Sequence, residues 1–247
     1  MLISYQTCLT KKTNLVGNVY LFEFLLIEPK EINFLAGQYV ILSIPLGEKT
    51  VSRLYSIASS PFKKKSFELV VELVEGGVGS TYLNNLKIGD QVLFKGPAGV
   101  FTLKENTKKK IFFATGTGIA PIRSMIKKTQ NSKLKSQNGS QKFLFWGLRR
   151  KSDVYFLEEF KKISQEDIHF QFKICLSREE RLDQIDNHFF SLGHVDQVFE
   201  KELFPKIKDK IDDFEFYLCG SRVIVESLRQ FLLQKNILPS TIFFEKF

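Results

Sequence analysis

Four consecutive residues carry groups that bind anions and flat ring systems: Arg53-Leu54-Tyr55-Ser56. Side chains of an extended segment alternate between faces, so Arg53 and Tyr55 project together. A guanidinium binds a phosphate through two hydrogen bonds, and a tyrosine beside it can lie flat against a flavin ring. The Ser56 hydroxyl can reach the redox edge of that ring. The alternative is an ordinary strand with an arginine at the surface.

A glycine-rich segment follows about one strand later and ends in two hydroxyl side chains. Gly77 and Gly79 let the backbone approach a phosphate closely, and Ser80 and Thr81 begin a short helix. Backbone N–H groups at that helix start, together with the two hydroxyls, suit a pyrophosphate. Alone, the segment also fits a hairpin followed by a helix N-cap. Its position shortly after the first motif favours the pyrophosphate.

A second glycine-rich segment follows the apolar run 111–113 and reads Thr115-Gly116-Thr117-Gly118-Ile119-Ala120-Pro121. A loop between a buried strand and a helix is where dinucleotides bind. Pro121 stands where the usual fingerprint has its third glycine, so that fingerprint does not apply. A proline near the first helical turn does favour helix initiation. The alternative is a glycine turn of any α/β domain.

Cys219 and Gly220 end the strand-like run 214–218, and a helical segment follows. Ligands of open parallel sheets bind at the carboxyl ends of the strands. Cys219 is therefore a candidate to lie over a nicotinamide ring. A small buried residue is the alternative, because free cysteines usually behave in that way.

Ser177 and Arg178 follow the strand-like run 170–176. A hydroxyl and a guanidinium at that strand end can bind the 2′-phosphate that distinguishes NADPH from NADH. The alternative is a solvated loop in which Arg181 pairs with the acidic residues at 179 and 180.

The sequence ends with an aromatic residue, Phe247, two positions after Glu245. We expect the Phe247 ring to stack over a flavin face and Glu245 to supply or relay a proton near the ring. The alternative is a final strand whose last phenylalanine only packs.

The elements that position these residues change character near residues 104–110, a polar and basic stretch. Before it, strand-forming runs separated by Gly, Pro and Lys-rich turns predict a small antiparallel barrel, with runs at 19–26, 38–44, 67–74 and 91–97 and a short helix at 80–86. The second run is expected to end before Pro45.

After the boundary, strands and helices alternate, which predicts a parallel sheet covered by helices on both faces. The strands are expected at 111–114, 142–147, 170–176, 214–219 and 241–244, and the helices at 121–129, 155–163, 195–203 and 223–234. A polar surface connection is expected at 130–141.

Composition excludes several classes of function. No apolar run reaches the ~18 residues of a membrane-spanning helix, and the first residues lack the layout of a secretory signal, so we expect a cytoplasmic protein without a membrane partner. The three cysteines form no C-x-x-C pair, which argues against zinc, iron–sulfur clusters or any other metal. The net charge is +9, but the lysine clusters are not interleaved with aromatic residues, so nucleic acid is not the expected partner.

In their order, these motifs resemble those of the ferredoxin–NADP⁺ reductase superfamily, which includes flavin reductases and oxygenase reductase components. The resemblance covers essentially the whole chain. It implies a two-domain β + α/β protein, with an N-terminal antiparallel six-stranded FAD-binding β-barrel over 1–104 and a C-terminal parallel-sheet α/β nucleotide-binding domain over 105–247.

The resemblance also implies roles for particular residues. FAD would be held by Arg53, Leu54, Tyr55, Ser56, Gly77, Gly79, Ser80 and Thr81. Tyr55 would stack on the isoalloxazine, and Ser56 would bond near its N5. The nicotinamide dinucleotide would be received by Gly116, Thr117, Gly118, Pro121, Ser177, Arg178, Cys219 and Gly220. Cys219 and Glu245 match positions that assist hydride transfer in the family. Ser56 and Phe247 would also assist hydride transfer. The family's terminal residue is often Tyr, so Phe247 keeps the stacking and loses the hydroxyl.

The expected activity is hydride transfer from NADPH to FAD, followed by electron transfer to a separate acceptor. A small acidic ferredoxin or flavodoxin would suit the positive charge. The alternatives are an NADH-dependent flavin reductase or the reductase component of an oxygenase, with NAD in place of NADP. A basic binding module without catalysis is a further alternative, which the lack of interleaved aromatic residues disfavours.

Overall fold

The computed structural model describes residues 2–131, 140–183 and 186–247. Most of the polar connection expected at 130–141 lies outside these residues. The chain divides into two compact units, of which the first comprises Met1–Lys104 with Ala120–Asn131 and the second Glu105–Ile119 with Ser132–Phe247. Each unit contains one six-stranded sheet.

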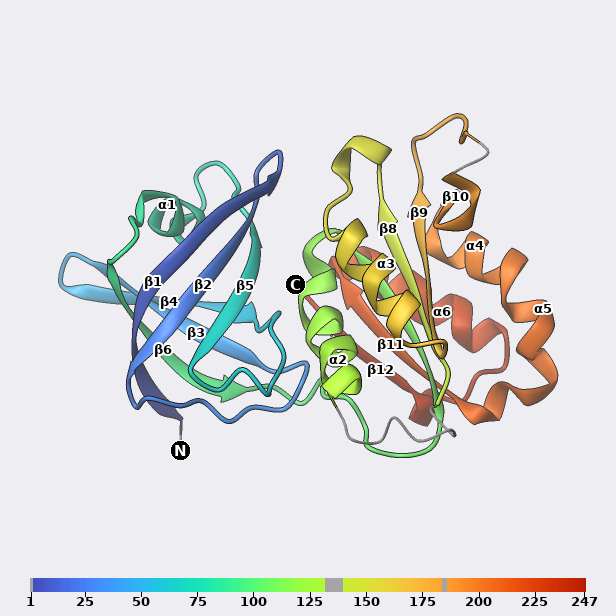
Figure 1. The fold of residues 1–247 in the computed structure, drawn as a ribbon, viewed down its shortest axis with the longest axis horizontal. Coiled ribbons are helices and arrows are strands. Elements are labelled where there is room, and N and C mark those ends of the chain that lie inside the picture. Colours follow the sequence, from blue (N-terminus) through green and yellow to red (C-terminus); the bar gives the residue numbers. More distant parts are fainter. Residues whose placement is uncertain (1, 132–139, 184–185) are drawn as a thin grey trace. The chain divides into compact units, whose positions relative to one another are not determined.

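The first unit is the predicted antiparallel barrel (Figure 1). Its elements are β1 (Ile3–Val16), β2 (Val19–Glu28), β3 (Tyr39–Leu46), β4 (Lys49–Ser56), β5 (Ser66–Glu72), α1 (Val78–Asn85) and β6 (Gln91–Ala98). The strands lie in the order β4-β3-β6-β1-β2-β5. An antiparallel bridge between Ile57 and Leu69 joins the two ends of this order, so the sheet closes on itself.

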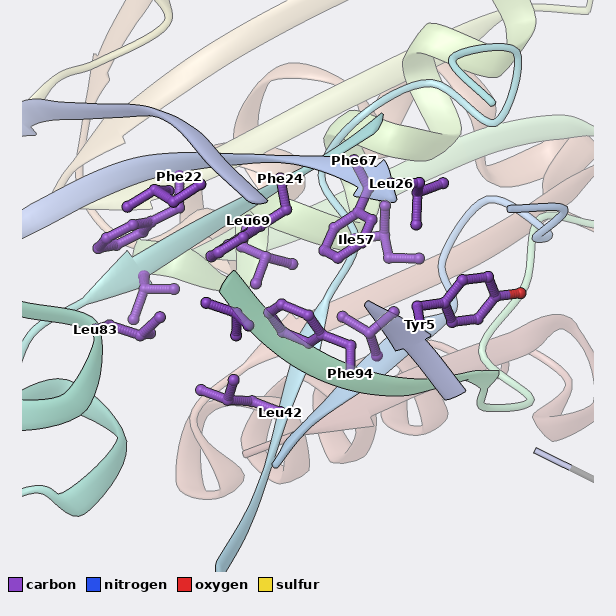
Figure 2. Packing of buried hydrophobic residues seen from close by; sticks show 14 of the residues in the cluster. Tyr5, Phe22, Phe24, Leu26, Leu42, Ile57, Phe67, Leu69, Leu83 and Phe94 are labelled. Atoms are coloured by element: carbon purple, nitrogen blue, oxygen red, sulfur yellow. The ribbon is translucent and has the colours of Figure 1, made fainter. Parts of the chain in front are cut away.

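Alternation of side chains builds the barrel core. In β2, Phe22, Phe24 and Leu26 are buried, and the residues between them are more exposed. Phe94 of β6 meets Phe24 and Phe67 edge-on, with ring centroids 4.9 and 5.1 Å apart (Figure 2). Edge-to-face contacts of this kind add to the free energy gained by burying the rings. The interior of this unit is therefore filled by its own side chains.

The second unit carries the predicted parallel sheet, in the order β10-β9-β8-β7-β11-β12. Its strands are β7 (Lys109–Thr115), β8 (Lys142–Leu148), β9 (Phe170–Leu176), β10 (Phe190–Leu192), β11 (Phe214–Gly220) and β12 (Ile242–Lys246). The helices in this part of the sequence are α2 (Ile119–Asn131), α3 (Leu157–Glu166), α4 (Val195–Glu202), α5 (Phe204–Ile207) and α6 (Arg222–Gln234). Helix α3 packs on one face of the sheet, and α4 and α6 pack on the other (Figure 1).

Three local features differ from the expectations. Strand β1 was not predicted, because polar residues alternate with Tyr5 and Leu9 in it. The three-residue β10 is too short to show a period. Strand β3 continues through Pro45, which pairs only with Thr50 of β4, since pairing with β6 extends no further than Leu42. A proline costs little where only one neighbour needs the backbone N–H.

Helix α2 packs as part of the first unit although it follows β7 of the second. Its Arg123, 3% exposed, donates to the carbonyl oxygen of Ala58 (2.9 Å) and to the carboxylate of Glu68 (2.7 Å). The ideal Cβ of Gly37 would lie 2.5 Å from Met125 Cε, which shows how closely the helix approaches the barrel backbone. A helix from later in the sequence thus packs against the barrel at Gly37, Ala58 and Glu68.

Across the described ranges, none of the helices is both long and apolar enough to cross a membrane.

Candidate flavin and nucleotide sites

The two motifs of the first unit that are predicted to bind FAD meet at Gly79. A Cβ on Gly79 would lie 2.3 Å from Tyr55 Oη and 3.1 Å from Arg53 Cγ. A side chain at position 79 would therefore displace the Tyr55 hydroxyl, which glycine leaves room for. The structure brings together Arg53, Tyr55 and Gly79, as a joint flavin site requires.

The N-terminus of α1 is suited to an anion. The helix has Gly77 as its N-cap, without a side-chain cap and without an acidic residue in its first turn. Unoccupied N–H groups and the helix dipole both favour a negative group there. The exposed Arg53 side chain beside Gly79 adds a guanidinium. These groups fit a pyrophosphate, and hence FAD.

Local hydrogen bonds place the two hydroxyl residues of α1. The Ser80 hydroxyl accepts the N–H of Val74 (2.9 Å), which fixes its rotamer and leaves its proton to donate. Ser80 is buried, whereas Thr81 is exposed and its N–H donates to Gly77 O. Ser80 therefore anchors the loop, and Thr81 offers the more accessible hydroxyl.

Tyr55 and Ser56 are half-buried at the end of β4. Burial raises the pKa of the Tyr55 hydroxyl, and the nearby Arg53 charge offsets part of that rise. Tyr55 is thus a neutral hydroxyl at physiological pH. Leu54 points the other way and is 58% exposed, as the alternation of a strand requires.

In the second unit, the dinucleotide loop rests on the end of β11. A Cβ on Gly118 would lie 2.3 Å from the carbonyl oxygen of Cys219, and one on Gly220 would lie 2.1 Å from Thr115 Oγ1. The neighbouring parallel strands β7 and β11 bring these segments to the same end of the sheet. The loop Gly116–Gly118 forms a 3₁₀ turn before α2, with Gly116 at φ +51°. Pro121 is buried in the first turns of α2.

Two aromatic residues that sequence analysis did not single out hold this loop. Trp146 Nε1 and Tyr155 Oη both donate to the carbonyl oxygen of Gly116, at 3.0 and 3.1 Å. Neither belongs to a nucleotide-binding motif, and they lie 30 and 39 residues from Gly116 in the sequence. Only the fold brings them to it.

Cys219 and Glu245 lie opposite each other on β11 and β12. Cys219 is 1% exposed, and burial, with the Glu245 charge as a smaller cause, raises the pKa of its thiol well above the ordinary value. The thiol is therefore protonated, so Cys219 is suited to packing against a neutral ring rather than to acting as a nucleophile. Glu245 is half-buried.

Ser177 and Arg178 lie at the carboxyl end of β9, beside the end of β8. The Arg178 N–H donates to the carbonyl oxygen of Arg149 (2.8 Å), and the Ser177 N–H donates to that of Leu148 (3.1 Å). Arg149 and Arg178 are both exposed. The strand register thus adds Arg149 to the predicted pair, a residue that sequence analysis missed because it follows a different strand. Glu179 accepts the Lys151 N–H, so one acidic neighbour is already engaged.

Phe247 continues the pairing of β12 with β11 beyond the strand. Its N–H donates to Gly220 O (3.3 Å), and its carbonyl oxygen accepts the Arg222 N–H (3.2 Å). Its ring is 64% exposed. The backbone is therefore fixed beside the nucleotide loop, and the ring remains accessible.

A cavity of about 580 Å³ lies elsewhere in the second unit, along β8 and β9. Phe143, Phe172, Lys173 and Phe189 are among its lining residues, and none of the predicted site residues lines it. The cavity is lined by lysines but by none of the glycine-rich turns or arginines of the predicted sites. Where the chain is described, no group of three or more His, Cys, Asp or Glu residues could hold a metal ion.

Comparison with known families agrees with this division of roles. Residues 6–103 match the oxidoreductase FAD-binding domain family, and residues 112–230 match the oxidoreductase NAD-binding domain family. The two matches follow each other in the order that the motifs predict.

Relatives and solved structures point the same way. The chain is 36% identical over 150 residues to ferredoxin–NADP reductase B of Sorangium cellulosum, which covers 60% of each chain. It is 29% identical over 219 residues to the toluate 1,2-dioxygenase electron transfer component of Pseudomonas putida, covering 88% of this chain and 60% of the relative. It therefore spans about 60% of the length of these curated relatives.

Among solved structures, the Amycolatopsis cytochrome P450 reductase is 26% identical, with a TM-score of 0.84 over 100% of this chain and 70% of the other. A ferredoxin NADP⁺ reductase from Neisseria gonorrhoeae, solved with bound FAD and NADP, has the same fold at 19% identity, with a TM-score of 0.81 over 98% of each chain. With an FAD-binding domain followed by an NAD-binding domain, the chain belongs to the ferredoxin–NADP⁺ reductase superfamily.

Proposed function

We propose that this protein oxidises NADPH with FAD and passes the electrons to a separate protein acceptor, a small acidic ferredoxin or flavodoxin. The observation that carries the proposal is the meeting of Arg53, Tyr55 and the uncapped N-terminus of α1 at Gly79. This arrangement suits a tightly held pyrophosphate better than a flavin bound only in passing. The match to an NAD-binding domain supports the other part of the proposal, the binding of a nicotinamide nucleotide as the hydride donor.

In this proposal the first unit binds and orients the flavin. Arg53 and the α1 N-terminus neutralise the pyrophosphate, with hydroxyls from Ser80 and Thr81. The Tyr55 ring would pack against the flavin ring and exclude water from it, and the Ser56 hydroxyl would supply a hydrogen bond to the flavin. FAD, when bound, takes up two electrons as a hydride and releases them singly.

The second unit binds and orients the nicotinamide nucleotide. The loop Gly116–Gly118 receives the dinucleotide where β7 ends, and Cys219 presents a neutral thiol toward the nicotinamide from the end of β11. Glu245, next to Cys219 in the sheet, holds or relays a proton. These roles follow the proposed division of the chain into an FAD-binding domain, residues 1–104, and a nucleotide-binding domain, residues 105–247.

The preference for NADPH rests on Ser177 and Arg178, now joined by Arg149. Two guanidinium groups at adjacent strand ends can bind one phosphate from two sides. We expect Arg178→Ala to raise KM for NADPH about tenfold, as the loss of one charged hydrogen bond predicts, and to leave KM for NADH nearly unchanged. Equal changes for both nucleotides would contradict the assignment.

The second candidate function is an NADH-dependent reductase component of an oxygenase. It is favoured by the similarity to the toluate dioxygenase component and by Glu180, an exposed carboxylate beside Arg178 that would repel a 2′-phosphate. A wild-type enzyme that reduces its flavin faster with NADH would select this function.

Free thiols support the proposed location. Cys8, Cys175 and Cys219 form no disulfide bond in the structure, and free cysteines are typical of a reducing compartment. We therefore propose the cytoplasm.

One experiment tests the proposed function as a whole. The purified protein is examined for flavin absorbance, reduced with NADPH and with NADH in a stopped-flow instrument, and then mixed with candidate acceptors. We expect about one FAD per chain, faster reduction by NADPH, and reoxidation by an acidic one-electron carrier. Protein that stays colourless after incubation with FAD would refute the proposal.

A further inference from the structure

The carbonyl oxygen of Gly116 is an unusually crowded hydrogen-bond acceptor. It receives Trp146 Nε1–H (3.0 Å) and Tyr155 Oη–H (3.1 Å). The Ile119 N–H also donates to it as the 3₁₀ turn closes. A carbonyl oxygen has two lone pairs, so three donors leave it little freedom to turn.

The two aromatic donors are themselves immobile. Trp146 is fully buried and Tyr155 is 6% exposed. Their rings meet edge-on, with centroids 4.7 Å apart, and Phe160 of α3 packs against Trp146 at 6.0 Å. Side chains packed in this way hold their rotamers, so they fix the position of any group to which they donate.

The fixed carbonyl determines where the next N–H points. A trans peptide is planar, and its C=O and N–H point in opposite directions. Because the Gly116 carbonyl faces Trp146 and Tyr155, the Thr117 N–H faces away from both rings. Gly116 has φ +51°, a left-handed conformation that glycine adopts without strain, and a Cβ there would meet no atom within 4 Å.

We propose that Trp146 and Tyr155 are positioning residues of the nucleotide site, which orient the Gly116–Thr117 peptide so that its N–H can bind the dinucleotide. This inference rests on the proposed function, because it assumes that the loop receives NADP. The two side chains touch the loop and not the ligand. They act by preventing the loop from turning its carbonyl oxygen, a negative dipole end, toward an anionic ligand.

Two conservative variants test the inference. Tyr155→Phe removes one donor and keeps the ring, and Trp146→Phe removes the other donor. Tyr217→Phe is a matched control, because it also removes a buried hydroxyl of the second unit, one that donates to Glu215 (2.8 Å). Glu215 also binds Lys110 (2.7 Å), in an ion pair outside the nucleotide loop.

The measurements separate positioning from general stability. For each FAD-loaded variant we would measure the Kd of NADP⁺ from the flavin difference spectrum, the rate of flavin reduction at saturating NADPH, the FAD content and the Tm. We expect Tyr155→Phe and Trp146→Phe each to raise the Kd about three- to tenfold, as expected for one lost hydrogen bond, with unchanged FAD content. The double variant should raise Kd by less than the product of the two, because both donors hold one carbonyl.

The outcomes are distinct. If the Kd of Tyr155→Phe equals that of the wild type, or if Tyr217→Phe weakens nucleotide binding as much at a similar Tm, the inference is wrong. If the wild-type protein binds no nicotinamide nucleotide, that result alone refutes the proposed function, independently of the variants.

Discussion

Arg53 is the residue on which flavin affinity should depend most. Its guanidinium is exposed, so its removal should not disturb the fold. We expect Arg53→Ala to weaken FAD binding by about 1.5–3 kcal/mol, the range for a hydrogen bond to a charged group. Lys49→Ala, which removes an exposed cation from the same strand, is the control. FAD titration by fluorescence quenching measures both, and equal affinities in the two variants would exclude Arg53 from the site.

The cysteines should differ in their reaction with an alkylating agent. Burial raises the pKa of the thiols of Cys175 and Cys219 far above the ordinary value, so almost no thiolate forms near neutral pH. Cys8 is only half-buried. We expect iodoacetamide to modify Cys8 first and to reach the other two only on unfolding, as peptide mass spectrometry would show. Early modification of Cys219 in the folded protein would contradict its role as a neutral group.

Phe247 offers an exposed ring on a fixed backbone. If that ring covers the flavin face that the nicotinamide needs, it must move away before hydride transfer, which requires an approach of about 3–3.5 Å. We expect Phe247→Ser to tighten NADP⁺ binding and to change kcat, with the fold intact by circular dichroism. Unchanged NADP⁺ affinity together with an unchanged flavin spectrum would show that Phe247 only packs.

At the scale of residues, sequence analysis proposed those whose chemistry is local to a motif. Gly79 and Gly118 were expected to let a ligand approach the backbone, and the structure shows that each also lies close to another part of the protein, Tyr55 and Cys219 respectively. Arg149, Trp146 and Tyr155 could not be predicted. Their proximity to the site follows from strand register and from the turn before α3, which no short stretch of sequence encodes.

Among the elements, α2 is joined to the barrel by an ion pair between Arg123 and Glu68. Burial by itself raises the pKa of Glu68, but the charge and hydrogen bond of Arg123, with smaller contributions from the charges of Lys127 and Lys63, outweigh it and lower the pKa to about 2. This stabilisation is complete above the ordinary pKa of a glutamate and is lost as the pH falls toward 2. A shift of this size corresponds to about 3 kcal/mol at neutral pH.

We therefore expect Arg123→Met to lower the free energy of unfolding by up to about 3 kcal/mol at pH 7, because it removes the largest favourable electrostatic contribution to the ionised Glu68 carboxylate. Urea denaturation at pH 7 and at pH 3 measures this, and the difference between variant and wild type should shrink at the lower pH. Lys63→Met removes a more exposed partner of the same carboxylate and should cost less than about 1 kcal/mol. An equal loss in both variants would contradict the role of Arg123.

Prediction of the elements succeeded where apolar residues followed a clear period, as in β2, β8 and α6. It failed for β1, whose outward-facing residues are polar and whose inward ones include Thr7, satisfied by the carbonyl of Val92. The packing of α2 with the barrel could not be predicted, since an isolated arginine in a helix does not reveal the carboxylate 55 residues earlier that it binds.

For the whole molecule, the net charge of +9 makes a prediction about its partner. If the acceptor is acidic, attraction speeds their encounter, and salt screens that attraction. We expect the second-order rate constant for acceptor reduction to fall about tenfold between low and high ionic strength. Reduction of a neutral quinone is the control and should change little. A rate with the protein acceptor that rises with salt would exclude an acidic partner.

The helix α2 also has a consequence for how the protein is made. The first unit consists of Met1–Lys104 and Ala120–Asn131, so its sequence is interrupted by β7. On the ribosome, the barrel strands are synthesised first, so Glu68 is present before Arg123, with which it forms an ion pair. Residues 105–131 take roughly one to five seconds to add at ordinary elongation rates. The packing of the barrel therefore cannot be completed before β7 has been synthesised, and a fragment that ends at residue 104 should lack both the Arg123–Glu68 ion pair and the packing of α2 against the barrel.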